Sequence, residues 1–122
     1  MKIVDTNVIL RFLLQDDEKQ SPESLRIIES GEIFIPNEVF VEVIYVLSSV
    51  YKFTKEDIYD VVQVLLNEDN VIFQDNDIID VAISTYANER LDIVDCMLYA
   101  YKKCENYAIE TFDKRLKRLI NG

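Results

Sequence analysis

Acidic residues are the main chemical resource of this chain. Its 122 residues include 23 Asp and Glu, two Cys, two Gly and no His, and the net charge is −10. The absence of His excludes a Ser-His-Asp triad, a His general base and a His metal ligand. Two isolated glycines are too few for a Gly-rich phosphate loop. Enzymatic chemistry would therefore depend on carboxylates, and any metal would be a hard cation held by oxygen atoms.

Four of the acids stand in apolar surroundings. Asp5 and Asp113 each follow a short apolar segment, and Asp95 is followed by an apolar run. Glu42 is the single charge within the apolar stretch 39–50, which we expect to be buried on most sides. An unpaired ionised carboxylate in such a helix is either costly or protonated. These acids therefore need a partner, a water-lined cleft or a cation.

Each of these acids also has an ordinary structural alternative. Asp5 and Asp113 are suited to cap the helices that follow them, and Asp92 is suited to cap the helix that contains Asp95. Asp92 and Asp95 are spaced three apart, so the two can cap that helix reciprocally. For Glu42 the alternative is a narrow exposed stripe on its helix. The residues alone leave both interpretations open.

Short apolar segments alternate with helical patterns along the chain. Strands are expected at 2–4, 33–35, 71–73 and 107–109. Helices are expected at 8–14, from Ser21-Pro22 to about 30, from the cap Asn37 to about 50, from Thr54 to about 66, at 77–90, at 92–105 and after Asp113. Strands separated by one or two helices pair in parallel. We therefore expect one α/β domain over residues 1–122, with three layers and a short parallel sheet of about four strands.

The expected sheet would bring the four acids to one place. In a parallel sheet the carboxyl ends of the strands and the starts of the following helices share one edge. Carboxylates that converge there at about 3–6 Å repel one another strongly. Bound Mg²⁺ or Mn²⁺ would relieve this repulsion and would also supply a catalyst for hydrolysis.

The whole chain resembles the PIN-domain ribonucleases of the VapC-like type, which are toxins of prokaryotic toxin–antitoxin pairs. Four ordered blocks match this family: residues 3–11, residues 35–36 with 39–43, residues 92–98, and residues 111–116. In the third block the family usually has Phe and Ala where this chain has Ile93-Val94, and Cys96 replaces a usual Ala. The resemblance implies an acidic pocket that binds Mg²⁺ or Mn²⁺ and cuts RNA. The metal-binding and catalytic acids that it implies are Asp5, Glu42, Asp95 and Asp113.

The resemblance also implies supporting residues and partners. Asn7 and Thr111, together with Asp92, would hydrogen-bond a ligand water or a carboxylate. Six of the 13 basic residues follow residue 101, and the candidate contacts to RNA phosphates are Arg11, Lys114, Arg115 and Arg118. The expected partners are the RNA substrate, a cognate antitoxin protein and a second copy of the chain in a homodimer.

Two other functions remain open, and the expected location is the cytoplasm. A phosphohydrolase of the haloacid-dehalogenase type needs a second Asp two residues after the first, where this chain has Asn7. A non-catalytic interaction module would use the apolar helices 39–50 and 58–66. No apolar stretch reaches the ~20 residues that a membrane span needs. Cys96 and Cys104 are too far apart in one helix to pair, and free cysteines without a signal segment indicate the cytoplasm.

Overall fold

The sheet consists of three short parallel strands. They are β1 (Lys2–Ile3), β2 (Ile33–Ile35) and β3 (Val71–Phe73), in the order β1-β2-β3. The computed structural model describes residues 1–122. Within it the chain divides into two units, Met1–Gln74 and Asp75–Gly122, and all three strands lie in the first. The α/β class and the parallel pairing expected from the sequence are confirmed, whereas the expectation of one domain over 1–122 stays a prediction.

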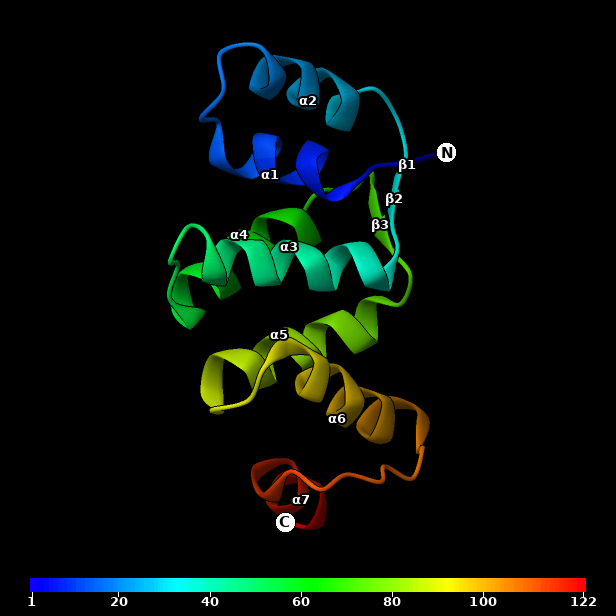
Figure 1. Cartoon of the computed structure of the whole chain (residues 1–122). Helices are drawn as coiled ribbons and strands as arrows, with labels where there is room; N and C mark the ends of the chain where they lie inside the picture. The colour runs from blue at the N-terminus through cyan, green and yellow to red at the C-terminus, as the bar shows by residue number, and fades with distance from the viewer. The chain divides into compact units, whose positions relative to one another are not determined.

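Two helices follow each of the first two strands of the first unit. They are α1 (Thr6–Leu14) and α2 (Gln20–Glu29) after β1, and α3 (Asn37–Ser49) and α4 (Lys55–Leu66) after β2. As Figure 1 shows, α1 lies beside α2 and above α3, and α3 packs on α4. The core contains Ile9, Ile35, Leu47 and Ile58, and the ring of Phe40 meets that of Phe73 edge-on at 5.9 Å. Parallel strands need a crossover connection of a dozen or more residues, and the helix pairs supply it here.

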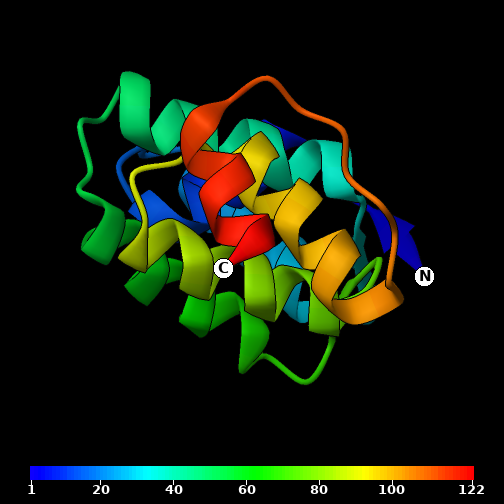
Figure 2. The ribbon, with the colours of Figure 1, turned by 90° about the horizontal axis from the view of Figure 1, so that it is seen from below.

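The second unit is entirely helical. It contains α5 (Asn76–Asn88), α6 (Ile93–Glu105) and α7 (Lys114–Asn121). Helices α5 and α6 pack along each other, and α7 packs on α6, as the view in Figure 2 shows. One side of α5 is buried through Ile78, Ile79, Ala82 and Ile83, and Leu116 anchors α7 with no exposed surface. None of the helices in the chain has the length and apolar character that crossing a bilayer requires.

The strand expected at 107–109 does not form. Residues 106–113 have no regular secondary structure and run as an extended connection from α6 to α7. A strand needs the backbone of a neighbour to satisfy its N–H and C=O groups, and the second unit contains no other strand. Tyr107 is 57% exposed and Phe112 is fully exposed, so this segment also lacks a buried face. The sheet therefore has three strands where the sequence predicted about four.

Helix starts agree with the sequence where a carboxylate or hydroxyl caps the backbone. Thr54 and Asp57 form a capping box at the start of α4, in which each side chain accepts a hydrogen bond from the backbone N–H of the other residue. Helix α2 begins one residue before Ser21, because Asp17 accepts hydrogen bonds from the backbone N–H groups of residues 19 and 20, which also lower the pKa of Asp17. Asn37 is the first residue of α3 rather than its cap. Pro36 occupies the cap position without a side-chain hydrogen bond.

Candidate active site

The four predicted acids divide evenly between the two units. Asp5 and Glu42 belong to Met1–Gln74, and Asp95 and Asp113 belong to Asp75–Gly122. The surroundings of each pair follow from its own unit.

Asp5 caps α1 with one of its two carboxylate oxygens. Its Oδ1 accepts a hydrogen bond of 3.1 Å from the backbone N–H of Val8. The buried Val4 directly before it fixes the chain, and Asp5 itself is exposed in an extended conformation. The capping alternative is thus correct for Asp5, but it uses only Oδ1. The second oxygen has no protein partner and is free to bind a cation or a water.

A pocket of about 300 Å³ adjoins Asp5. Its polar lining comes from both helices that follow β1, and it includes Asp5, Asn7, Arg11, Gln20, Glu23 and Ser24. We call it the Asp5 pocket. Two of the predicted residues, Asn7 and Arg11, therefore lie in the same pocket as Asp5. Asn7 is exposed there, with its amide available to a ligand.

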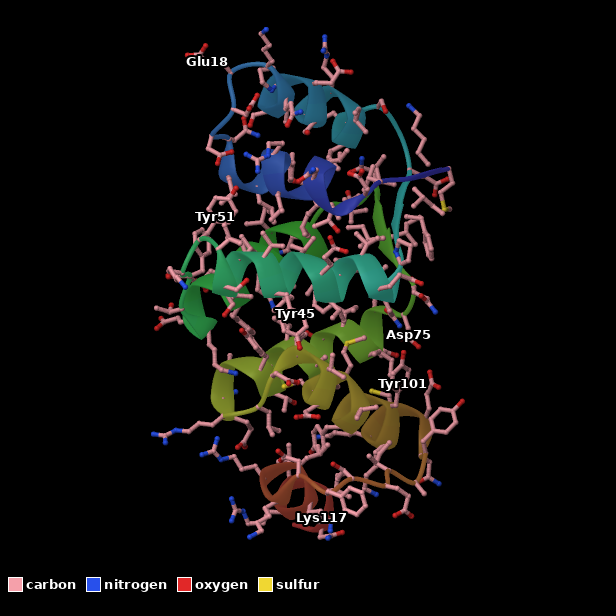
Figure 3. The ribbon with its side chains drawn as sticks, viewed as in Figure 1. Glu18, Tyr45, Tyr51, Asp75, Tyr101 and Lys117 are labelled. Carbon is pink, nitrogen blue, oxygen red and sulfur yellow. The ribbon has the colours of Figure 1, made fainter.

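The guanidinium of Arg11 is hydrogen-bonded to two side chains of the first unit. Its Nη1 donates to Oδ1 of Asp16 at 2.7 Å, and its Nη2 donates to the hydroxyl of Tyr51 at 2.8 Å; Figure 3 shows Tyr51 beside the end of α1. The hydrogen bond to Tyr51 and the charge of Asp16 raise the pKa of Arg11 above its usual value. The sequence offered no signal for Tyr51, which lies 40 residues away. The predicted contact of Arg11 with phosphate stays a prediction, but two of its nitrogens are occupied.

Glu42 lies on an exposed stripe of α3. The residues that share this stripe are Glu38, Tyr45 and Ser49, which recur at helical spacing. The opposite side of α3 is buried through Phe40 and its neighbours. The expectation that Glu42 stands in a helix buried on most sides is therefore wrong, and the alternative of an exposed stripe is correct. Glu42 forms no ion pair, so its carboxylate is free to act as a ligand.

In the second unit Asp92 caps α6 and Asp95 is crowded by other acids. Oδ1 of Asp92 accepts a hydrogen bond of 2.9 Å from the backbone N–H of Asp95. The reciprocal bond to the Asp95 carboxylate does not form, so only half of the suggested box exists. Asp95 is half-buried. Burial, followed by the charges of Asp92 and Asp113, raises the pKa of Asp95 above its usual value.

Asp113 caps α7 in the way that Asp5 caps α1. Its Oδ1 accepts a hydrogen bond of 2.8 Å from the backbone N–H of Leu116. The hydroxyl of Thr111 in turn accepts one of 3.1 Å from the backbone N–H of Asp113. Thr111 therefore holds the backbone of a predicted ligand, and its predicted hydrogen bond to a ligand water or a carboxylate stays a prediction. Like Asp5, Asp113 keeps one carboxylate oxygen free.

The donors present suit a hard cation better than zinc. Asp92, Asp95 and Asp113 offer only oxygen atoms, and their mutual repulsion favours a bound positive charge. The thiols do not assist, since Cys96 is buried and Cys104 is exposed elsewhere on α6. Within either unit no three His, Cys, Asp or Glu residues are placed to hold an ion by themselves. The oxygen donors therefore fit a hard divalent cation in kind.

Two of the basic residues that the sequence predicted as contacts to RNA phosphates line a second pocket. Arg115 and Arg118 of α7 contribute to a pocket of about 510 Å³, and so does Arg90 after α5. Lys114 is exposed and lies outside this lining. The sequence prediction missed Arg90, although a signal was present. Arg90 stands two residues before Asp92, just as Arg115 stands two residues after Asp113.

Known proteins match the chain over nearly its full length. The PIN domain family matches residues 2–121. A VapC ribonuclease of Aquifex aeolicus (strain VF5) is 35% identical over 126 residues, which cover 98% of this chain and 92% of that protein. No solved structure matches the chain.

Proposed function

Because the chain belongs to the PIN-domain family and to its VapC-like ribonucleases, we propose that it is an endoribonuclease toxin that hydrolyses RNA with bound Mg²⁺ or Mn²⁺. The PIN-like α/β fold expected from the sequence is confirmed by the family match. The proposed cation ligands are Asp5, Glu42, Asp95 and Asp113. The observation that supports the cation most directly is the position of Asp95, whose pKa is raised by burial and then by the charges of Asp92 and Asp113.

The side chains of the two units would have different tasks in this reaction. A bound divalent cation supplies charge stabilisation for the phosphodiester and lowers the pKa of a coordinated water. Asp95 would help to hold the cation, and a carboxylate of the site would accept the proton of the attacking water. In Asp5 and Asp113, Oδ1 accepts the capping hydrogen bond at a helix start. This bond orients the carboxylate, whose second oxygen would bind the cation. Asn7 would hydrogen-bond a cation-bound water or a carboxylate at the Asp5 pocket.

The direct test is cleavage of a panel of labelled RNAs by the purified protein with Mn²⁺, with Mg²⁺ and with a chelator. We expect cleavage with either cation, none with the chelator, and a loss of at least about a hundredfold for Asp5→Asn and Asp95→Asn, since even residues that only orient metal ligands cost 10–100-fold. Asp60→Asn is the matched control, because Asp60 is an exposed acid of α4 outside the Asp5 pocket. Equal cleavage by wild type, Asp5→Asn and Asp95→Asn would indicate a contaminating nuclease and would overturn the proposal.

A second candidate, the non-catalytic interaction module, is supported by apolar surface on the first unit. Val50, at the end of α3, is 65% exposed, and Val64 of α4 is 50% exposed. Such side chains suit a protein partner, and we propose a cognate antitoxin and a second copy of the chain as partners, with the cytoplasm as the location. Titration with Mn²⁺ separates the two functions. A saturable site that Asp95→Asn abolishes supports the nuclease, whereas the absence of any site favours a pure interaction module.

A further inference from the structure

Three arginines converge on one pocket of the second unit. Arg90 follows α5, while Arg115 and Arg118 lie one turn apart on α7. Together with Asn88, Glu89 and two leucines they line a cavity of about 510 Å³, which we call the arginine pocket. Glu89 is the only acid in this lining. In a chain with a net charge of −10 this is a local excess of positive charge.

The three guanidinium groups lack carboxylate partners. The ion pairs of the structure are those of Arg11 with Asp16 and of Arg26 with Glu23, both in the first unit. Arg115 is instead held by a neutral group, because its Nη1 donates to the backbone oxygen of Arg90 at 3.2 Å. This bond fixes Arg115 at the pocket wall and leaves its charge uncompensated. Like charges that line one pocket repel each other, and an anion between them would relieve that repulsion.

The position of the pocket along the chain connects it with the predicted acids. Arg90 is two residues from Asp92, and Arg115 is two residues from Asp113. Two residues of chain span at most about 7 Å. The arginine pocket is therefore built by the same two segments that position Asp92 and Asp113. An extended polyanion with one phosphate at these acids would place a neighbouring phosphate within reach of the arginines.

We propose that the arginine pocket binds a backbone phosphate of the RNA strand, next to the phosphate that is cleaved. This inference rests on the proposed ribonuclease function, because the adjacent acids give the pocket its relation to the strand. Planar guanidinium groups bind phosphate through paired hydrogen bonds, whereas an ammonium group acts as a point charge. The contact positions the strand and is independent of base identity. Arg90 and Arg118 are thus strand-positioning residues and take no part in the chemical step.

The test is binding of a short single-stranded RNA in the presence of a chelator, measured by fluorescence anisotropy over a series of KCl concentrations. Without a divalent cation the RNA stays intact, so binding is measured separately from cleavage. We expect Arg90→Ala and Arg118→Ala each to weaken binding and to reduce the slope of log K against log [KCl] by about 0.7, the value for one phosphate contact on a single strand. Arg118→Lys should keep the slope and still bind more weakly than wild type.

The matched control is Lys117→Ala in the same helix. Lys117 is exposed, outside the pocket lining, and its Nζ lies 5.9 Å from the centre of the Phe112 ring; Figure 3 labels it. The control should bind RNA with the slope of wild type. Unchanged slopes for Arg90→Ala and Arg118→Ala, or an equal reduction for Lys117→Ala, would overturn the proposal. Melting temperatures equal to that of wild type confirm that the variants are folded.

Competition distinguishes the occupant, and the cleavage assay distinguishes this inference from the proposed function. Poly-glutamate is the competitor that represents an acidic protein segment. If it displaces labelled RNA from wild type as effectively as unlabelled RNA does, and fails to displace it from Arg118→Ala, the pocket fits an acidic protein segment and the RNA assignment is wrong. If Arg118→Ala loses affinity while Asp5→Asn still cuts like wild type, the pocket binds RNA but the catalytic proposal fails. If Asp5→Asn abolishes cleavage and Arg118→Ala binds like wild type, only the arginine pocket is wrong.

Discussion

The two units use the same local structure to place an acid but surround it differently. Asp5 and Asp113 both cap a helix with one oxygen and keep the other free. In the first unit the one basic residue of the Asp5 pocket, Arg11, donates hydrogen bonds to Asp16 and Tyr51. In the second unit the acids crowd one another, and the nearby arginines have no carboxylate partner.

This difference indicates where ligands would have the greater effect. In the first unit the guanidinium of Arg11 is held by Asp16 and Tyr51, so that Arg11 contributes mainly to holding α1 in place. In the second unit the repulsion among acids and among arginines is uncompensated. A cation at the acids and an anion at the arginines would each lower the free energy of the folded state. We therefore expect substitution of Arg11 to change stability, and substitution of Arg118 to change binding.

The largest expected effect separates the two tasks of Asp113. Asp113→Asn keeps a side-chain acceptor for the cap but loses the charge, so we expect RNA cleavage to fall by at least about a hundredfold with little change in melting temperature. Asp113→Ala should lose the same activity and, in addition, about 1 kcal/mol of stability. Thr54→Ala is the matched control, since it removes the cap of α4 and should cost similar stability without loss of activity. Asp113→Asn with wild-type activity would show that the free oxygen has no catalytic use.

An intermediate effect tests whether Arg11 stabilises the fold while Arg118 binds RNA. Arg11→Ala removes the hydrogen bonds to Asp16 and Tyr51 and should lower the free energy of unfolding by about 1 kcal/mol. Tyr51→Phe should give a smaller loss of the same kind. Both variants should leave the salt dependence of RNA binding unchanged, whereas Arg118→Ala changes that dependence and leaves stability unchanged. Urea unfolding measures the first quantity, and anisotropy the second. A lower salt slope for Arg11→Ala would make Arg11 a phosphate contact and would remove the contrast between the units.

The smallest expected effect concerns the stability of the protein without a divalent cation. Burial, with Asp92 and Asp113, raises the pKa of Asp95 in the folded state. A raised folded pKa means that the protonated form is favoured, so stability is greatest below the unfolded value of about 3.9 and is lost as pH rises through the folded value. Asp95→Asn should therefore melt slightly higher than wild type at neutral pH in a chelator, and the difference should disappear in acid. Asp60→Asn serves as the control, and a lower neutral-pH melting temperature for Asp95→Asn would contradict the crowding.

Local patterns in the sequence predicted what local interactions determine. The strands at 33–35 and 71–73 form as expected, and so does the helix that follows Thr54, because short apolar runs and side-chain caps act within a few residues. The strand at 107–109 was not predictable in the same way, since an apolar triplet becomes a strand only beside a partner. The exposure of Glu42 depends on which neighbours cover α3, and the partner of Arg11 lies in a distant segment.

The acids proposed for the active site differ in whether they also cap a helix. Asp5, Asp92 and Asp113 each hold a helix start, so selection for a stable chain would retain them even after activity had decayed. The side chains of Glu42 and Asp95 cap no helix, and Asp95 is placed at some cost. In a lineage that became a pseudoenzyme these two positions would drift first. Under the proposed function, Glu42 and Asp95, rather than the aspartates at the helix starts, are therefore the residues whose loss would best mark an inactive relative.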